Sequence, residues 1–531
     1  MPNDCVTYQN SGYFIPLIVD YLNQKSELKS LYNRFPTIEN FKHQLEEKGK
    51  NFPLENRKIL VDALKKQHAK FEISEVTSNN IELLNQTNTF TITTGHQLNL
   101  FTGPLYFIYK IISVINLTKE LKIAYPEHNF VPIYWMATED HDFEEINFFN
   151  FKNKKIEWKK ESKGPVGRLN TQGMDLVFDA FSSELGLGNN AYYLRDLFKK
   201  AYIEHDNLAD ATRYLTYKLF EKEGLVIVDG DDTELKKIFI PFAKDELLHQ
   251  TSFKKVNETL SLLKDYSIQV NPREINLFYI QDQLRERIIY ENGNYKINNT
   301  LLSFSESELL TELENNPENF SPNVILRPLY QELVLPNLCY IGGGGEIAYW
   351  LELKSNFEAH KITFPILLVR NSVLLVTKKQ LSKLEKLNLN WKDIFLNRET
   401  LLNNKTKELS KFTVDFSEQK EILKKQFKLV NEIANQTDPS FLGAVKAQEV
   451  KQLKGLYNLE KRLLKAEKRI YKEKLERITQ IQNQLFPNQG LQERTANFSS
   501  FCDEIDSFDS FLDQLQTELQ PLSHHFSVVN L

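Results

Sequence analysis

Cysteine is scarce in this chain: its 531 residues include only three, Cys5, Cys339 and Cys502, far apart in the sequence. Such spacing forms neither a disulfide framework nor a zinc knuckle. Long apolar runs are also missing, and the N-terminus lacks the basic and apolar regions of a signal peptide. These absences predict a soluble protein of the reducing cytoplasm, with no membrane partner.

An excess of positive charge is absent as well. The net charge is −5, so the chain carries no electrostatic footprint for non-specific binding to nucleic acid. A hydrophobic content of 41% with 12% aromatic residues excludes a disordered chain. The length predicts at least two domains.

The segment TITTGHQLNLFTGPLYFIYK (91–110) predicts a buried strand, a turn and a long helix. Gly95 allows the turn, and Pro104 suits the first position of a helix. A strand that feeds directly into a helix N-terminus creates an anion site. The candidate residues are Thr94, Gly95, His96, Gln97, Gly103 and Pro104, with His96 donating to negative charge that develops during a reaction. An ordinary turn with a surface histidine is the alternative.

A second apolar run, FVPIYWMA (130–137), ends in an acidic cluster. Two apolar strands joined by a long helix predict a parallel βαβ unit, whose ligands gather at the carboxyl ends of the strands. Glu139, Asp140, His141 and Asp142 lie at such an end. They could form a polar pocket that binds an amine or positions a general base, or could remain a charged loop. Adjacent residues of an extended chain point to opposite faces, so we expect no metal site made by all of them.

Two further groups follow later core strands. Gly342, Gly343, Gly344 and Gly345 let a ligand approach the backbone closely, and Glu346 with Tyr349 would suit a ligand ammonium or hydroxyl. Arg327, near Gln331, could hold a carboxylate or phosphate, although a structural ion pair is an equal alternative. Arg370 and Asn371 are weaker candidates, after FPILLVRNSVLLV (364–376), which predicts one core strand.

The pattern of apolar runs and helical spacings in the sequence divides the chain into an α/β part and a helical part. A helical cap precedes a parallel-sheet core that ends at about 376 and carries insertions at about 147–222 and 250–320. Residues 377–500 predict a coiled-coil domain, and 501–531 a segment that packs back on the core. The coiled coil is indicated by a seven-residue step along one helix: Val450, Tyr457, Leu464, Tyr471, Ile478 and Leu485. Such a stripe needs helix 417–433 as an antiparallel partner, a second subunit, or both.

Several motifs in this order resemble one known family. TTGHQLNLFTGPLYFIYK, VPIYWMATEDHDFEEIN, ILRPLYQELVLPN and YIGGGGEIAYWLELK are similar to those of the cysteine-adding enzymes of bacillithiol biosynthesis. The resemblance covers essentially the whole chain. It implies a Rossmann-like core similar to class I aminoacyl-tRNA synthetases and nucleotidyltransferases, with two connecting insertions and a coiled coil that forms a homodimer.

The resemblance also implies an activity. Cysteine would be joined to glucosaminyl malate in the last step of bacillithiol biosynthesis, after activation of its carboxylate by ATP or another adenine nucleotide, and it leaves room for Mg²⁺. His96 stands near the histidines of the class I HIGH motif, but this chain has GHQ and no KMSKS-like loop. His96, Asp140 and His141 become the expected catalytic residues, and Arg327 the expected carboxylate ligand.

Two other functions compete with this one. A metal-dependent hydrolase could use His96 with residues 139–142, and an interaction protein could use the coiled coil while its core is a catalytic relic.

Overall fold

The computed structural model describes residues 5–531 and divides the chain into two compact units. One unit, the sheet domain, extends to Leu375 and includes Gln492–Val529 and Leu531. The other, the helical domain, is formed by Val376–Leu491 together with Asn530. The C-terminal segment thus belongs mainly to the sheet domain. Within the described residues, no helix is both long and apolar enough to cross a membrane.

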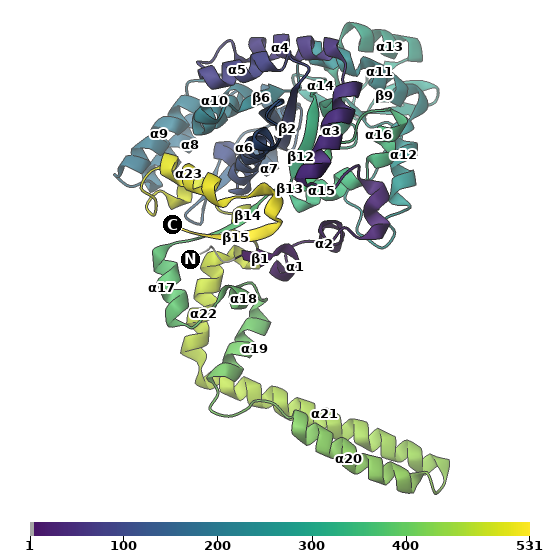
Figure 1. Cartoon of the computed structure of the whole chain (residues 1–531), viewed down its shortest axis with the longest axis vertical. Coiled ribbons are helices and arrows are strands. Elements are labelled where there is room, and N and C mark those ends of the chain that lie inside the picture. The colour runs from purple at the N-terminus through teal and green to yellow at the C-terminus, as the bar shows by residue number, and fades with distance from the viewer. Residues whose placement is uncertain (1–4) are drawn as a thin grey trace. The chain divides into compact units, whose positions relative to one another are not determined.

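A five-stranded parallel sheet forms the centre of the sheet domain, as the apolar runs predict (Figure 1). Its order is β13-β12-β2-β3-β6, and every neighbouring pair is parallel. The strands are β2 (Thr89–His96), β3 (Asn129–Met136), β6 (Val226–Asp229), β12 (Asn337–Gly342) and β13 (Ile366–Val369). Helices cover both faces, so the strands are buried along almost their whole length. The strand order reverses between β2 and β12, which is therefore the topological switch point.

The helix after β2 starts later than the sequence predicts. Helix α6 is Tyr106–Ala124, and Gln97–Leu105 form a loop with a short 3-10 turn at Leu100–Thr102. Pro104 therefore lies before the helix, and the strand does not feed directly into it. The C-terminal segment holds this loop, because the Asn497 amide donates to the carbonyls of Phe101 (2.7 Å) and Gly103 (2.6 Å). Such a distant contact leaves no local signal.

The predicted single strand at 364–376 was wrong. The chain forms β13 in the parallel sheet and then β14 (Ser372–Val376) in a second, three-stranded sheet of order β1-β15-β14. The break comes at Arg370 and Asn371, where the buried Glu493 carboxylate accepts from the Arg370 guanidinium (2.8 Å) and from the Val373 N–H (3.0 Å). Hydropathy alone cannot detect this exchange of sheets, since both strands are apolar.

Other elements of the sheet domain surround the parallel sheet. Five helices precede β2: α1 (Tyr8–Ser11), α2 (Pro16–Leu22), α3 (Ile38–Asn51), α4 (Leu54–His68) and α5 (Glu75–Leu83). Between β3 and β6 lie α7 (Phe143–Ile146), β4 (Phe148–Phe151), β5 (Lys154–Glu157), α8 (Met174–Glu184), α9 (Asn189–Tyr202) and α10 (Leu208–Phe220). The C-terminal part and its partner strand are α23 (Phe508–Glu518), β15 (His525–Asn530) and β1 (Cys5–Thr7).

The segment between β6 and β12 contains a second mixed α/β insertion. Its helices are α11 (Thr233–His249), α12 (Thr251–Leu260), α13 (Glu306–Asn315) and α14 (Arg327–Val334). Its antiparallel sheet, of order β10-β9-β8-β7-β11, consists of β7 (Leu277–Gln281), β8 (Leu284–Glu291), β9 (Asn294–Ile297), β10 (Ser303–Phe304) and β11 (Phe320–Pro322). Two helices lie between β12 and β13: α15 (Gly344–Leu351) and α16 (Lys354–Ala359).

The helical domain is built around a long antiparallel hairpin of α20 (Ser417–Ala434) and α21 (Pro439–Ile470), which lie side by side (Figure 1). The other helices are α17 (Lys378–Lys386), α18 (Trp391–Ile394), α19 (Arg398–Leu409) and α22 (Lys472–Leu485). The predicted unbroken helix was wrong, since α21 ends before Tyr471 and α22 begins after it. Beyond this break, α22 buries Leu475, Ile478 and Leu485, and it contacts α17 and α19.

Removal of a buried side chain from β2 tests the core of the sheet domain. Ile92 is fully buried between α3, α6 and the neighbouring strands. We expect Ile92→Ala to lower the free energy of unfolding by about 2–5 kcal/mol, since it leaves a cavity. Urea unfolding measures this, with Ile123→Ala as the control, because Ile123 is 83% exposed on α6. Equal losses in both variants would contradict the assignment of Ile92 to the core.

Candidate functional site

The candidate site lies at the switch point, where the carboxyl ends of β2 and β12 meet. Tyr340 of β12 pairs with Thr93 of β2, which brings Gly95 and Gly342, two residues further along, to the same edge. Gly342 leaves no room for a side chain, and Gly95 leaves little. A Cβ at Gly95 would stand 3.2 Å from the Tyr340 hydroxyl and 3.6 Å from an Arg327 nitrogen, and one at Gly342 would clash with the Glu346 side chain at 2.9 Å.

An ion pair between a buried lysine and a partly exposed glutamate joins the helices that follow these two strands. Lys110 Nζ of α6 lies 2.6 Å from Glu346 Oε1 in the first turn of α15, and it donates to the Gly95 carbonyl at 2.8 Å. The Tyr340 hydroxyl and the Gly343 N–H also donate to Glu346. Burial raises the pKa of Glu346, but Lys110 and these hydrogen bonds outweigh it and hold the pKa below its usual value. The carboxylate predicted to bind a ligand ammonium is therefore already paired with Lys110.

Arg327 has a different environment from Lys110. Its guanidinium donates to Gln331 Oε1 (3.0 Å) and to the Tyr349 hydroxyl (3.2 Å), both neutral, and lies 5.7 Å from the centre of the Tyr340 ring. Within residues 5–531 it forms no ion pair. The predicted grouping of Arg327, Gln331 and Tyr349 is thus present, and it leaves one cation without a carboxylate.

A third cation, Arg370, faces the same edge. It pairs with Glu493 at 2.8 Å, and its Nε is buried with no hydrogen-bond partner in the described structure. The guanidinium lies 5.1 Å from the Tyr106 ring centre, and a Cβ at Gly343 would be 3.7 Å from Nε. Arg370, one of the weaker candidates from the sequence, therefore lies beside the glycine turn at Gly343.

His96, at the end of β2, is buried against Tyr106 and Phe107, with ring centroids 5.3 Å and 4.9 Å away. Its Nε2 has no hydrogen-bond partner among the described residues. Burial, and then the positive charges of Lys110 and Arg370, hold the pKa of His96 well below its usual value. The imidazole is therefore neutral, and it can give or accept one hydrogen bond but cannot act as a cation.

Gly103 and Pro104 do not form the predicted helix-end anion site. The Leu105 N–H donates to the Ala496 carbonyl (2.8 Å), and the Gly103 carbonyl accepts from Asn497. The C-terminal segment thus occupies the backbone groups that the sequence assigned to a ligand. Thr94 likewise uses its hydroxyl within the sheet, donating to the Ile341 carbonyl at 2.7 Å.

The acidic residues after β3 form a network with an arginine of the second insertion. The Gln97 amide donates to Asp140 Oδ2 (3.0 Å), and Arg285 of β8 lies 2.6 Å from His141 Nδ1 and 3.8 Å from Asp140. These hydrogen bonds and Arg285 outweigh burial and hold the pKa of Asp140 below its usual value. Glu139 instead pairs with the buried Lys236. Arg285 was missed, because a lone arginine in a short strand gives no sequence signal.

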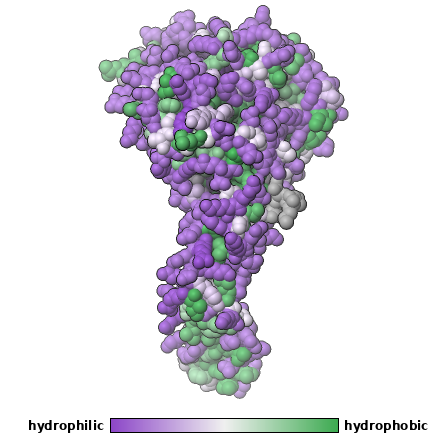
Figure 2. Space-filling view, turned by 90° about the vertical axis from the view of Figure 1, so that its left-hand side faces the viewer, coloured by the Kyte–Doolittle hydropathy of each residue, from purple (hydrophilic) through white to green (hydrophobic). Residues whose placement is uncertain are grey.

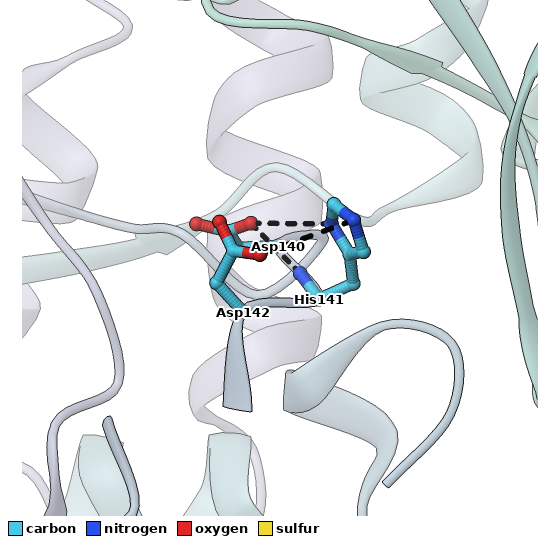
Figure 3. A group of neighbouring side chains, drawn as sticks. All are labelled: Asp140, His141 and Asp142. Atoms are coloured by element: carbon cyan, nitrogen blue, oxygen red, sulfur yellow. Dashed lines mark hydrogen bonds and ion pairs between the residues drawn. The ribbon is translucent and has the colours of Figure 1, made fainter. Parts of the chain in front are cut away.

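Asp140, His141 and Asp142 cluster together, against the expectation from an extended chain (Figure 3). Potential ligand atoms of all three lie within 4.8 Å of one another, because β3 ends at Met136 and the following residues turn. Metal binding would compete with Arg285, which already occupies His141 Nδ1. The geometry therefore favours an ionic network over a metal centre.

Two further acids at the sheet edge were not singled out from the sequence: Asp229, the last residue of β6, and Asp231, which follows it. Asp229 Oδ1 accepts from the Thr138 hydroxyl and from the Asp231 N–H, and Asp231 forms a two-point ion pair with Arg168 (2.8 and 2.9 Å). Burial and the neighbouring charge of Asp231 raise the pKa of Asp229 to about 6. The run GLVIVDGDD (224–232) held the signal, an acidic exit from a core strand.

Comparisons with known proteins agree with this architecture. Residues 1–371 match the model "Bacillithiol biosynthesis BshC, N-terminal Rossmann-like domain", and residues 373–531 match "Bacillithiol biosynthesis BshC, C-terminal coiled-coil domain". Relatives named "Putative cysteine ligase BshC" include one from Flavobacterium psychrophilum (64% identity, 100% of this chain and 99% of the relative) and one from Bacillus cereus strain AH187 (30%, 92% and 93%). A solved structure of a candidate arginyl-tRNA synthetase from Campylobacter jejuni covers 84% of this chain and 98% of its own, at 12% identity and a TM-score of 0.21, too low to support an argument.

The doubly wound sheet, the cations at its switch point and the helical hairpin define an α/β enzyme with a coiled-coil domain. More particularly, the chain belongs to the BshC family of bacillithiol biosynthesis, whose relatives above are named as ligases. The resemblance seen in the sequence is thereby confirmed. Membership favours neither the metal-dependent hydrolase nor the interaction protein.

The raised pKa of Asp229 predicts a pH dependence of stability. The folded protein holds this proton more tightly than the unfolded chain, whose aspartates have a pKa of about 3.9. The proton on Asp229 therefore stabilises the folded protein. This stabilisation is complete below that pKa and is lost as the pH rises through about 6. Asp229→Asn has no carboxyl group to titrate and should not show this loss. Between pH 4 and pH 7, we expect the free energy of unfolding of the variant to rise by about 2 kcal/mol relative to that of the unmodified protein. Urea unfolding over this range measures it.

Asp62→Asn is the matched control, because Asp62 is an exposed carboxylate of α4. Its stability curve should follow that of the unmodified protein. A curve for Asp229→Asn parallel to both would show that Asp229 titrates normally.

Proposed function

We propose that this protein is a ligase that forms an amide between the cysteine carboxyl group and the amino group of glucosaminyl malate, the last step of bacillithiol biosynthesis. We further propose that ATP or another adenine nucleotide activates the carboxylate, with Mg²⁺ as its accompanying ion. Family membership supports the reaction, and the charges at the switch point support the use of anionic substrates.

One observation carries the proposal: the switch point has more positive than negative charge. Lys110 is paired with Glu346 and Arg370 with Glu493, whereas Arg327 has only neutral partners. A partly buried cation without a carboxylate loses hydration that a negatively charged ligand can replace. Carboxylates and phosphates both fit a guanidinium with two hydrogen bonds.

The chain's own groups suit the activation of a carboxylate. Gly342–Gly345 and Gly95 let a ligand approach the backbone, and Arg327 can hold an oxyanion there. The neutral His96, with its free Nε2, can donate a hydrogen bond without repelling the cations beside it. A bound nucleotide supplies the leaving group that a free carboxylate lacks. The residues therefore bind and orient charged groups away from water, and need not form a covalent bond.

Incubation of the protein with cysteine, glucosaminyl malate and ATP, with mass detection of the thiol product, tests the reaction. We expect product only when all three are present, with stoichiometric release of AMP or ADP. Arg327→Gln should lower kcat/KM about 100-fold, because it removes a charged hydrogen bond worth about 2–3 kcal/mol. Arg273→Gln, at an exposed arginine of the same domain, should keep normal activity. Full activity of Arg327→Gln would exclude Arg327 from the site.

We also propose that the helical hairpin forms a homodimer. Many apolar side chains of α20 and α21 are exposed, and Figure 2 shows apolar surface at one end of the hairpin. The exposed residues are Ile422, Leu429, Val430, Ile433, Phe441, Val450, Tyr457, Leu459 and Ile470. Val450 and Tyr457, on the seven-residue stripe, are 65% and 55% exposed. An unburied heptad stripe is typical of a coiled coil that needs another partner.

A charge on this stripe tests the dimer. Val450→Glu combined with Tyr457→Glu places carboxylates in the proposed interface, so we expect the protein to become monomeric. Light scattering after size-exclusion chromatography measures its mass. Lys451→Glu, at an exposed position beside the stripe, is the control and should leave the mass unchanged. A monomeric unmodified protein, or a dimeric double variant, would contradict the proposal.

A further inference from the structure

A cavity opens beside the switch point, at the carboxyl ends of β3 and β6. Its volume is about 790 Å³. Thr138, Asp229 and Asp231 line it at the sheet edge, and Lys160, Lys163 and Arg168 line it from the first insertion. None of these residues belongs to the sites predicted from the sequence, and no step described above uses the cavity.

The sheet side of this cavity offers a free carboxylate oxygen. Both hydrogen bonds that the Asp229 carboxylate accepts within the described chain fall on Oδ1. Asp231 is neutralised by Arg168, which also pairs with Asp282 at 3.1 Å. Oδ2 of Asp229 therefore remains available to a ligand that donates hydrogen bonds.

The rest of the lining carries charges of both signs: the lysines and Arg168 lie among Glu161, Asp210, Asp282 and Glu318. Lys163 is exposed and makes no ion pair within residues 5–531, and Lys160 donates only to the carbonyl and amide oxygens of Asn170. Lys70 also lines the cavity, with Asp210 3.4 Å away. A ligand in the cavity thus meets the free carboxylate oxygen of Asp229 and the ammonium groups of Lys160 and Lys163, which form no ion pair within the described residues.

This distribution of charge selects the ligand chemistry. An amine would lie against Asp229, and carboxylates would lie toward Lys160 and Lys163. Cysteine also has both groups, but they are adjacent on a single carbon and cannot span the two sides. The volume lies in the range typical of larger ligands, about 300–1,000 Å³. An amino sugar that carries a dicarboxylate fits both the charge order and the size.

The position is suitable for transfer of the amine. His96, Met136 and Asp229 are in register across three neighbouring strands. Because neighbouring strands are about 4.8 Å apart, Asp229 lies about 10 Å from the end of β2. The amine of a bound ligand would therefore be on the side of the cavity nearest the activated carboxylate.

We propose that this cavity is the binding site of the amine acceptor, with its ammonium on Asp229 and its carboxylates at the lysine rim. The inference rests on the proposed ligase function, and it assigns the second substrate a site separate from the cations of the switch point. Glucosaminyl malate is the probe, and glucosamine is a second probe that keeps the amine but lacks the dicarboxylate.

Isothermal titration of the full chain with glucosaminyl malate tests the inference. Asp229→Asn keeps an oxygen for Thr138 and Asp231 but removes the charge, so we expect Kd to rise at least 10-fold. Lys163→Glu should raise Kd at least 5-fold, because it repels the carboxylates. Asp62→Asn, at an exposed acid of α4, is the control and should bind normally. Circular dichroism confirms folding of each variant.

Competition and kinetics separate the two ends of the ligand. Glucosamine should inhibit the Lys163→Glu variant as well as the unmodified protein, and should inhibit Asp229→Asn less. The KM for cysteine should stay within twofold in both variants. If both variants bind glucosaminyl malate within twofold of the unmodified protein while product forms, the cavity assignment is overturned and the ligase function stands. If the unmodified protein neither binds the acceptor nor forms product, the proposed function fails, and this inference fails with it.

Discussion

The ion pair between Lys110 and Glu346 joins the helices that follow the two strands of the switch point, β2 and β12, whose backbones pair directly. Lys110 comes from the helix after β2, and Glu346 from the helix after β12. Burial lowers the pKa of Lys110 and the nearby carboxylate opposes this, so the pair is stable only while both partners are present. Lys110 also binds the Gly95 carbonyl, and this contact fixes the turn from which His96 and Gln97 extend. The arrangement of the site thus depends on one buried contact.

Around this pair, the edge of the sheet has two electrostatic regions. Over β2 and β12, the unpaired Arg327 makes the environment cationic and suits an anion. Over β3 and β6, the free oxygen of Asp229 makes it anionic and suits an amine. An amide-forming enzyme must bring a carboxylate and an amine together although both are hydrated in solution. The cation over β2 and β12 and the carboxylate over β3 and β6 would bind the carboxylate and the amine separately, along one edge of the sheet.

Much of the fold could be predicted, because buried parallel strands are continuous apolar runs and long helices have a regular spacing. β2, β3, β6 and β12 were found in this way. Most of the errors come from contacts between residues distant in sequence. Asn497 shapes the loop before α6, and Glu493 turns the chain between β13 and β14. The turn after Met136 gathers Asp140 and His141, and Arg285 reaches them from another strand.

The sequence by itself determined the family, the parallel sheet and the strand ends where a site could lie, because these depend on local patterns and on motif order. Tertiary structure decided which charges remain free. Glu346 and Glu139 looked like ligand groups, but Lys110 and Lys236 neutralise them, whereas Arg327 and Asp229 keep a free group. A charge is available to a ligand only if no partner is close, and the distance to a partner is a property of the packed chain.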